Sequence, residues 1–559
     1  MPSKIQTRSK SLKGQKQKRN NFTVAKSPNF ILFISDQHRA DQLACYGNDI
    51  VKTPNIDSIA ARGARFDHFY VATPICMPNR GTLMTGRMPS LHGSRHNGIP
   101  LSLSATTFVD ILAAAGWDTA LIGKCHLQSM SPKKPTLGMP NVDPDLVMPP
   151  ADLREADKTI LSQGSYTQEL TSSWADPDHE LDLPYYGFQH VELCVGHGDK
   201  VVGHYGRWLE ERHPGSKSLR GPDNQLPGNT YSAPQAWRTA IPEELYPTSY
   251  VAERTCDYLD EHAKDKDAKP FFIQCSFPDP HHPFTPPGKY WDMYDPQDMP
   301  LPKSFYSNHE LPSHLAAIHK LRDEGKDNRD GQRAIGINET DAREAMALNY
   351  GQVTMVDDCI GRILTKLTEL GMDEDTVVIF TTDHGDFLGD HQLLLKAALH
   401  YQGLVRVPFI MADPKTEDAG SVREDLSGTV DIAATVLARA GLAPQNGNQG
   451  RDLMNPDARD PDTPVIIEEH QRYGYMGLGD GFRARTLMGR RWRFTVYDDG
   501  EIGASGLGEL YDLENDPLEQ INLFDDPDHQ AIRAELTDQL LHQVMNMVDT
   551  SPLATHHGP

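Results

Sequence analysis

Short apolar runs that end abruptly in polar residues recur along the chain. They cover residues 30–34, 119–122, 271–273 and 377–380, and polar or charged side chains follow each one closely. A short run that is apolar throughout is typical of a strand buried on both faces of a sheet. In open α/β sheets, ligands bind at the carboxyl ends of the strands. The polar residues that follow these runs are therefore the first candidates for a functional site.

Between these runs, apolar residues recur with helical spacing. A helix is predicted from Pro54, with its apolar face provided by isoleucines, to Gly63. Residues 341–370 and 429–440 show the same spacing, and a glycine follows each segment. Strands that alternate with helices predict an α/β fold, in which a large, mainly parallel sheet is flanked by helices on both faces.

Two regions interrupt this alternation. Residues 127–240 are rich in Pro, Gly, Asp and Ser, and we expect a long insertion that lies over the site or at a subunit contact. Residues 285–340 are similarly polar. Short predicted strands at 465–467 and 491–496 indicate a smaller C-terminal α+β domain built on an antiparallel sheet. The predicted division is a disordered basic tail (1–27), a catalytic domain (28–441) and a C-terminal subdomain (442–559).

Charge is distributed unevenly along the 559 residues. The net charge is −24, yet residues 1–26 carry eight basic and no acidic side chains, which leaves about −32 on the remainder. An acidic body is a poor partner for nucleic acid or an anionic membrane, so neither is expected. No run of 18 apolar residues occurs, and the tail lacks a signal-peptide core. Seven scattered cysteines without C-x-x-C spacing fit a reducing compartment, which predicts a cytoplasmic protein.

The most informative segment is residues 76–87. It reads Cys-Met-Pro-Asn-Arg-Gly-Thr-Leu-Met-Thr-Gly-Arg, that is, C-x-P-x-R followed by L-x-T-G-R. In a chain of this composition, C-x-P-x-R alone is expected about 0.03 times by chance. A short helix predicted to begin near Pro78 would place Cys76 at the positive end of a helix dipole, and Arg80 could reach back toward it. A buried structural cysteine before a proline turn is the alternative interpretation.

This segment resembles the signature of the type I sulfatases of the alkaline phosphatase superfamily. In that family the cysteine is oxidised to formylglycine, and the hydrated aldehyde is the catalytic nucleophile. The resemblance implies that Cys76 is the modified residue, that a formylglycine-generating enzyme is a partner, and that the fold is alkaline phosphatase-like. It covers about residues 28–525, apart from the insertion. Residues 406–410 resemble the family's R-V-P strand, and residues 509–517 resemble its closing E-L-Y-D-L-x-x-D-P run, which we interpret as a structural turn.

Two polar pairs, Asp36-Gln37 and Asp383-His384, follow the first and last of the four apolar runs. Their two carboxylates, amide and imidazole suit a hard or borderline divalent cation such as Ca²⁺, Mn²⁺ or Mg²⁺. Each pair alone would more often form a turn or a helix cap. In the sulfatase family the matching positions, together with the modified Cys76, bind one Ca²⁺ or similar ion. Many arylsulfatases have Asp-Asp and Asp-Asn there, so the pairs in this chain are closer to the choline sulfatase and phosphonate monoester hydrolase branch.

Three further blocks complete the resemblance. Lys124 and His126 lie in G-K-C-H, the family's G-K-x-H, and imply sulfate binding and diol activation, although a bend is needed for both to enter one pocket. The run P-H-H-P-F implies His281 as the acid for the leaving group, with His282 as the alternative. Lys396 matches the lysine after the family's D-x-G-x-x-L-G-x-H run and implies a contact to the substrate oxygens.

Together these features predict a sulfuric ester hydrolase of the arylsulfatase type. It would use formylglycine and one divalent ion, Ca²⁺ or Mn²⁺, on a small-molecule sulfate ester, and we expect a homo-oligomer. The second hypothesis keeps the machinery and changes the substrate to phosphonate monoesters or phosphodiesters. A binding protein with a plain thiol at Cys76 is a third hypothesis, but every expected catalytic group is present. A two-zinc alkaline phosphatase does not fit, because the histidines do not cluster with Asp at two sites.

Overall fold

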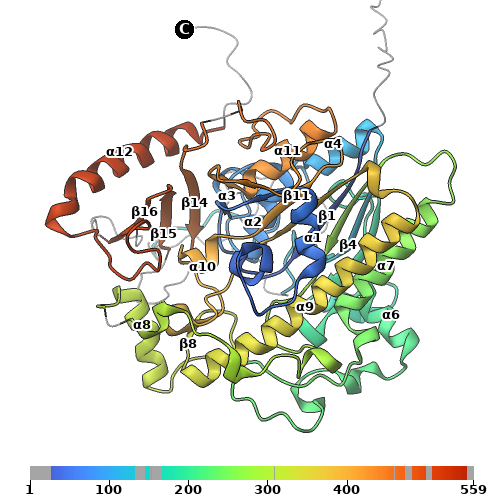
Figure 1. Cartoon of the computed structure of the whole chain (residues 1–559), viewed down its shortest axis with the longest axis horizontal. Coiled ribbons are helices and arrows are strands. Elements are labelled where there is room, and N and C mark those ends of the chain that lie inside the picture. The colour runs from blue at the N-terminus through green and yellow to red at the C-terminus, as the bar shows by residue number, and fades with distance from the viewer. Residues whose placement is uncertain are drawn as a thin grey trace, which may run out of the picture.

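The computed structural model describes residues 27–549, except 132–144, 151–152, 154–165, 308, 459, 472–480 and 499–506. Its centre is a nine-stranded sheet in the order β12-β2-β11-β9-β1-β7-β4-β5-β6 (Figure 1). The strands are β1 (Asn29–Ser35), β2 (Ala64–Phe66), β4 (Asp118–Gly123), β5 (His190–Val195), β6 (Val202–Gly203), β7 (Phe271–Ser276), β9 (Thr376–Thr382), β11 (Phe409–Ala412) and β12 (Ser421–Arg423). The tail predicted at 1–27 lies almost wholly outside the described residues.

Five neighbouring strands, β9-β1-β7-β4-β5, are mutually parallel, while β11 and β6 run antiparallel to their neighbours. All four strands predicted from apolar runs are among the five. Side chains of β1 alternate between two apolar clusters, with Phe30 and Leu32 in one and Ile31 and Phe33 in the other. The sheet is therefore buried on both faces, as the uninterrupted apolar runs predict.

Helices form a layer on each face of the sheet. The helices α1 (Pro54–Arg62), α6 (His204–Arg212), α7 (Pro247–His262) and α9 (Glu339–Glu369) supply apolar residues to one cluster. The helices α2 (Cys76–Thr85), α4 (Phe108–Ala115) and α11 (Ile432–Arg439) supply them to the other. The helices predicted over 54–63, 341–370 and 429–440 are thus confirmed, the last as a 3₁₀ turn followed by α11.

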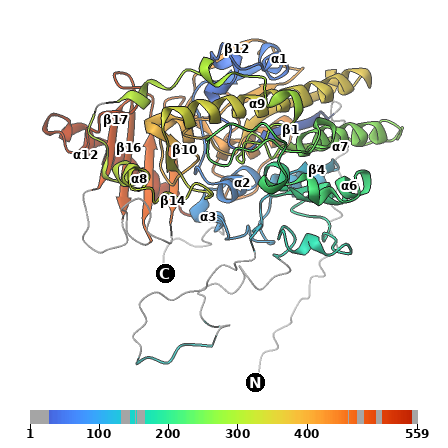
Figure 2. The same cartoon turned by 90° about the horizontal axis from the view of Figure 1, so that it is seen from below.

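A separate four-stranded antiparallel sheet lies at one end of the molecule, with α12 (Gln530–Asn546) beside it (Figure 2). Its strands are β14 (Val465–His470), β15 (Arg483–Met488), β16 (Trp492–Asp498) and β17 (Gly508–Asp512). Two of these were predicted from apolar runs. The interpretation of residues 509–517 as a turn is wrong for its first part, because Glu509 to Asp512 lie in β17 and the turn begins only afterwards.

The remaining α-helices and strands have at most 11 residues each. They are α3 (Pro89–His92), α8 (Ser313–Asp323), α10 (Gln402–Val405), β3 (Phe69–Tyr70), β8 (Ile335–Gly336), β10 (Leu393–Leu394) and β13 (Ser427–Gly428). The region predicted as an insertion, 127–240, is in part a component of the sheet, since it supplies β5, β6 and α6. The sequence of β5 gave no signal because it begins at an exposed histidine and has a half-buried glutamate at its third position. No helix in the described part of the chain has the length and apolar character to cross a membrane.

Candidate active site

The register of the central strands places their carboxyl ends side by side. Ser35 at the end of β1 pairs with Thr382 at the end of β9, so that the residues Asp36 and Asp383 emerge next to each other. Ser276 at the end of β7 pairs with Gly123 at the end of β4. The polar residues that follow all four strands therefore meet at one edge of the sheet, where ligands bind in open α/β folds.

Four side chains from this edge and from α2 form a compact cluster. The candidate ligand atoms of Asp36, Cys76, Asp383 and His384 all lie within 4.8 Å of one another, and all four residues are buried. The Oδ1 atom of Asp36 is buried and has no hydrogen-bond partner among the described residues. His384 directs Nδ1 to the carbonyl oxygen of Gly385 at 2.9 Å, which leaves Nε2 facing the cluster. A bare carboxylate oxygen beside a second carboxylate and an oriented imidazole fits a divalent cation.

Gln37 lies beside the cluster and contacts it through several groups. Its backbone N–H donates to Asp383 Oδ1 at 3.2 Å. Its side-chain Nε2 contacts Asp386 and lies 3.2 Å from His282 Nδ1, while its Oε1 accepts from Lys396 at 3.4 Å. The amide nitrogen therefore points away from the cluster, and Oε1 is the atom available to an ion. Gln37 has a φ of +62°, a turn that brings its side chain back toward the strand ends.

Arg80 acts on Asp383 from within α2. Its Nε donates to Asp383 Oδ2 at 2.8 Å, and its Nη1 donates to the carbonyl oxygen of Lys124 at 3.3 Å and to Ser276 Oγ at 3.1 Å. Burial lowers the pKa of Arg80, but Asp383, Asp36 and Cys76 together outweigh it, and the net shift is upward. Asn79 adds a bond from Nδ2 to the Asp383 carbonyl oxygen at 2.6 Å. The C-x-P-x-R segment is thus tied directly to the end of β9.

Cys76 is the first residue of α2 and has 1% of its surface exposed. Its Sγ lies 3.0 Å from His384 Nε2 and 3.0 Å from Lys396 Nζ. Burial raises the pKa of the thiol, but Lys396, His384 and Lys124 outweigh that effect, and the pKa lies well below its ordinary value. The surroundings of residue 76 therefore stabilise negative charge, as expected at a site for an anionic group.

Lys124 and His126 enter one pocket because the chain bends twice. Gly123 has a φ of +109°, and a Cβ there would lie 1.8 Å from the carbonyl oxygen of Ser276. His126 has a φ of +58°. Lys124 Nζ then contacts Asp36, and the His126 imidazole lies near enough to Cys76 for that residue to raise its pKa, although burial lowers the pKa more. The bend that the spacing of the two residues requires is therefore built from a glycine and a left-handed histidine.

His281 and His282 have different partners. His281 Nδ1 donates to the carbonyl oxygen of His282, so its Nε2 accepts from Lys396 Nζ at 2.9 Å. His282 contacts Gln37 through Nδ1 and Gln332 Oε1 through Nε2 at 3.1 Å. Both ring nitrogens of His282 are thus engaged by amides. His281 is the histidine that faces the lysine beside Cys76.

Sequence reasoning missed several residues that hold this site together. Glu169 accepts the backbone N–H groups of residues 126, 127 and 128, at 2.6, 2.9 and 3.0 Å, and so fixes the bend after β4. Asp386 binds Gln37, and Ser276 binds Arg80. His197 lies 2.8 Å from Lys124 Nζ. Glu169 and His197 come from the region predicted as an insertion, where no strand or motif marked them, whereas Asp386 lies three residues after Asp383 in a quoted motif.

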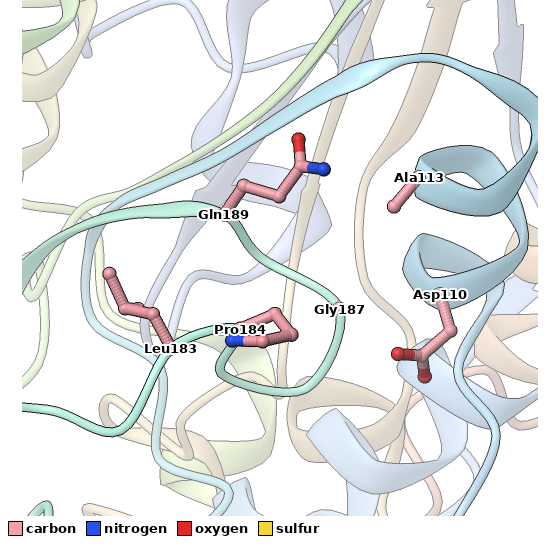
Figure 3. A pocket seen from close by; sticks show the side chains of 6 residues that line it. All are labelled: Asp110, Ala113, Leu183, Pro184, Gly187 and Gln189. Carbon is pink, nitrogen blue, oxygen red and sulfur yellow. The ribbon is translucent and has the colours of Figure 1, made fainter.

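A hollow of about 470 Å³ lies away from these residues, between α4 and the segment before β5 (Figure 3). It is lined by Asp110, Ala113, Leu183, Pro184, Gly187 and Gln189. Asp110 Oδ2 already accepts two hydrogen bonds from Thr107 at the start of α4, and Gln189 accepts one from the backbone of Thr119. Its polar side chains thus serve the fold, and the cluster around Cys76 is the better candidate for chemistry.

Comparison with known proteins agrees with this geometry. The Sulfatase family model matches residues 28–442, and the model for the C-terminal part of N-sulphoglucosamine sulphohydrolase matches residues 389–546. The chain is 27% identical to an arylsulfatase of Clostridium perfringens, over 90% of this chain and 91% of the relative. It is 28% identical to the multifunctional alkaline phosphatase superfamily protein PehA of Trinickia caryophylli, over 95% and 97%.

Among solved structures, the phosphonate monoester hydrolase of Agrobacterium radiobacter superposes with a TM-score of 0.71 and 25% identity. The match covers 94% of this chain and 97% of that one. Since the family model spans well over half of the sequence, family membership follows directly. The chain belongs to the sulfatase family of the alkaline phosphatase superfamily and is a sulfuric ester hydrolase.

Proposed function

We propose that the protein hydrolyses sulfate monoesters of small molecules, with residue 76 in the formylglycine form as nucleophile and one divalent ion beside it. The observation that carries this proposal is that three cationic side chains meet one buried cluster: Lys396 contacts Cys76, Lys124 contacts Asp36 and Arg80 contacts Asp383. The described body is strongly acidic and repels anions at long range. Concentrated positive charge at one point is therefore what a sulfate group needs in order to bind.

The ion would be held by Asp36, Asp383 and His384, with Gln37 Oε1 and the oxygen of modified residue 76 completing the set. When bound, a divalent ion would neutralise the sulfuryl oxygens and favour attack at sulfur. Arg80 would keep the Asp383 carboxylate oriented toward the ion through its bond at 2.8 Å. A formylglycine-generating enzyme is the partner this proposal requires, because the chain encodes a cysteine at position 76.

Two histidines would move the protons. Formylglycine supplies, in its hydrated form, the oxygen that replaces the leaving alcohol on sulfur. His281 Nε2 accepts from Lys396 Nζ at 2.9 Å, so it would first take a proton from Lys396 and then pass it to the leaving oxygen. His126, whose pKa is lowered by burial and influenced by Cys76, would accept a proton from residue 76 as sulfate departs. His282 is held by two amides and has no free nitrogen for this role.

The test is turnover of 4-nitrophenyl sulfate by protein co-expressed with a formylglycine-generating enzyme, compared with protein made without it. The peptide that contains residue 76 is analysed by mass spectrometry in both samples. We expect activity to scale with the fraction of formylglycine. Activity that is equal in modified and unmodified material would reject the nucleophile, and no activity on any sulfate ester in modified material would reject the substrate class.

A second function has one specific observation in its favour. The phosphonate monoester hydrolase of Agrobacterium radiobacter has a similar fold over nearly the whole chain, and the Asp-Gln and Asp-His pairs set this chain apart from many arylsulfatases. Phosphonate monoesters carry one negative charge and a tetrahedral centre, as sulfate monoesters do. Comparing kcat/KM for 4-nitrophenyl sulfate and 4-nitrophenyl phenylphosphonate on the same preparation ranks the two substrates directly.

A further inference from the structure

We propose that His197, a residue of the loop after β5, positions His281 and Lys124 and forms the wall of the site on the leaving-group side. The inference rests on the proposed function, since it assigns His197 a part in the same reaction. It is carried by contacts that involve neither Cys76 nor the signature segment. His197 lies in a region that sequence patterns left without a role.

The first contact is a stack of two imidazoles. The ring of His197 lies over the ring of His281 with centroids 3.8 Å apart and planes 12° from parallel. His281 is stacked on its other side by His282, at 4.0 Å and 27°. The His281 ring is therefore held in its plane between two neighbours. The orientation of the His281 ring determines whether its Nε2 faces Lys396. The stack therefore keeps Nε2 where it can exchange a proton with Lys396.

The second contact is to Lys124. His197 Nε2 lies 2.8 Å from Lys124 Nζ, and the same nitrogen lies 3.7 Å from Asp36 Oδ2. Lys124 Nζ also contacts Asp36 itself. The ammonium is thus held by two partners on two different segments. Removal of His197 would leave Lys124 with Asp36 as its side-chain partner and free it to move away from the substrate oxygens.

The loop that carries His197 is built rigidly against the His281 segment. A Cβ at Gly198 would lie 2.6 Å from Pro283 Cγ and 3.0 Å from Thr285 Oγ1, and Gly198 has a φ of +54°. One residue further, the buried carboxylate of Asp199 accepts from Trp237 Nε1 at 2.9 Å, Thr239 Oγ1 at 3.0 Å and Gly221 N at 3.0 Å. The close packing at Gly198 and the hydrogen bonds of Asp199 therefore hold the loop, and with it His197, in place.

Exposure shows on which side of the site His197 lies. Its side chain is 19% exposed, whereas the side chains of Lys124 and Asp36 are fully buried and His281 is buried. His197 thus stands between the buried charges and the solvent. It does so next to the histidine proposed to protonate the leaving oxygen. A leaving group protonated by His281 would lie beside His197, and His197 would therefore border its path.

Three substitutions separate the two contacts. His197→Phe keeps a flat ring for the stack and loses the bond to Lys124, while His197→Asn keeps a polar partner and loses the stack. His197→Ala removes both. His213, an exposed histidine after α6 in the same region, gives the matched control His213→Ala. Each variant is checked for its metal content per chain and its thermal unfolding midpoint before assay.

Steady-state kinetics are measured with an alkyl sulfate and with 4-nitrophenyl sulfate. We expect His197→Ala to lower kcat on the alkyl ester by about tenfold or more, with a smaller loss on the nitrophenyl ester, because only a poor leaving group needs protonation. Relative to His197→Ala, His197→Phe should recover most of the kcat on the alkyl sulfate because the stack is kept. Its KM should stay above the wild-type value because the bond to Lys124 is lost, and His213→Ala should match wild type. Equal losses on both esters, or none, would overturn the role.

A structural comparison tests the positioning role without an activity assay. In crystal structures of wild type and His197→Ala, we expect the His281 ring to rotate out of the bond with Lys396 only in the variant. An unchanged ring would overturn the proposal, whatever the kinetics show. A wild-type protein that turns over neither ester while His281 rotates in the variant would instead count against the proposed function.

Discussion

The Nζ atom of Lys396 lies 3.0 Å from the Sγ atom of Cys76, although 320 positions separate the two residues. Cys76 begins α2, and Lys396 follows β10 in the loop region after β9. The same ammonium also reaches His384 at 3.0 Å and His281 at 2.9 Å. One lysine thus contacts the proposed nucleophile, a proposed metal ligand and the proposed acid.

Cys76→Ala should leave a folded protein whose turnover of 4-nitrophenyl sulfate falls by about 10³-fold or more, because a covalent nucleophile is lost. The matched control is Cys256→Ala, which removes a half-buried thiol on α7 and should behave as wild type. Near-normal turnover by Cys76→Ala would end the proposed mechanism.

Metal analysis of the purified enzyme should give about one divalent ion per chain, because the two groups of candidate ligands found in the described residues share Asp36. Asp36→Asn and Asp383→Asn should each reduce the content to about 0.1 ion or less after dialysis. Asp292→Asn, at an exposed carboxylate paired with Arg238, should retain the ion. Full metal content in both cluster variants would place the ion elsewhere.

His281→Ala should lower kcat on alkyl sulfates far more than on 4-nitrophenyl sulfate, since a good leaving group needs little protonation. Lys396→Ala should show the same bias and, in addition, raise KM, because Lys396 also faces residue 76. His282→Ala is the comparison that separates the neighbours. If its bias matches that of His281→Ala, the assignment of the acid is wrong.

Stability should depend on pH through Glu519, a buried residue whose Oε1 lies 2.6 Å from Arg493 Nε. Burial raises the pKa of Glu519 from 4.5 to about 7, more than the nearby Arg493 lowers it. A carboxyl with a raised folded pKa stabilises the fold fully below its unfolded pKa, and that contribution is lost as pH rises toward 7. The loss is on the order of 3 kcal/mol between pH 4.5 and 7.

The measurement is urea unfolding of wild type and Glu519→Gln between pH 4.5 and 8. In Glu519→Gln the free energy of unfolding should not show this decrease with pH, because glutamine does not titrate. Its amide oxygen can still accept from the backbone N–H of Gln402. Glu535→Gln, at an exposed position of α12, is the control and should follow wild type. Parallel slopes for wild type and Glu519→Gln would contradict the raised pKa.

Gly123→Ala should destabilise the fold by more than about 2 kcal/mol, because a Cβ would meet the Ser276 carbonyl oxygen and the φ of +109° is strained. Gly116→Ala is a close control, since Gly116 has a φ of +107° and no atom within 4 Å of its added Cβ. The difference between the two midpoints in denaturant isolates the collision from the backbone strain. Equal midpoints would show that the segment after β4 can shift.

The parts of the fold that could be predicted were those encoded locally. The runs at 30–34 and 377–380 are apolar at every position because β1 and β9 are buried on both faces. Residues that follow such strands could be expected to meet, as Asp36 and Asp383 do. The strand β5 gave no such signal, because its first residue is exposed and the edge strand β6 beside it has only two residues.

Residues that support the site from a distance could not be found this way. Glu169 has no motif, and its function depends on three backbone N–H groups that turn toward it only after the bend at Gly123 has formed. His197 depends on a stack with a residue 84 positions away. Such contacts arise from tertiary packing, which leaves no periodicity in the sequence. The family resemblance identified the site residues that lie in sequence motifs, and Glu169 and His197 lie in none of these motifs.

The burial of Cys76 implies that its proposed modification would have to come before the chain has folded. Its thiol is covered by His384 and Lys396, which the ribosome adds more than 300 residues later. The proposed formylglycine-generating enzyme would need access to this thiol, and residue 76 is only 1% exposed in the folded protein. The proposed oxidation would therefore compete with folding, and a chain that folds first would keep an unreacted thiol at residue 76.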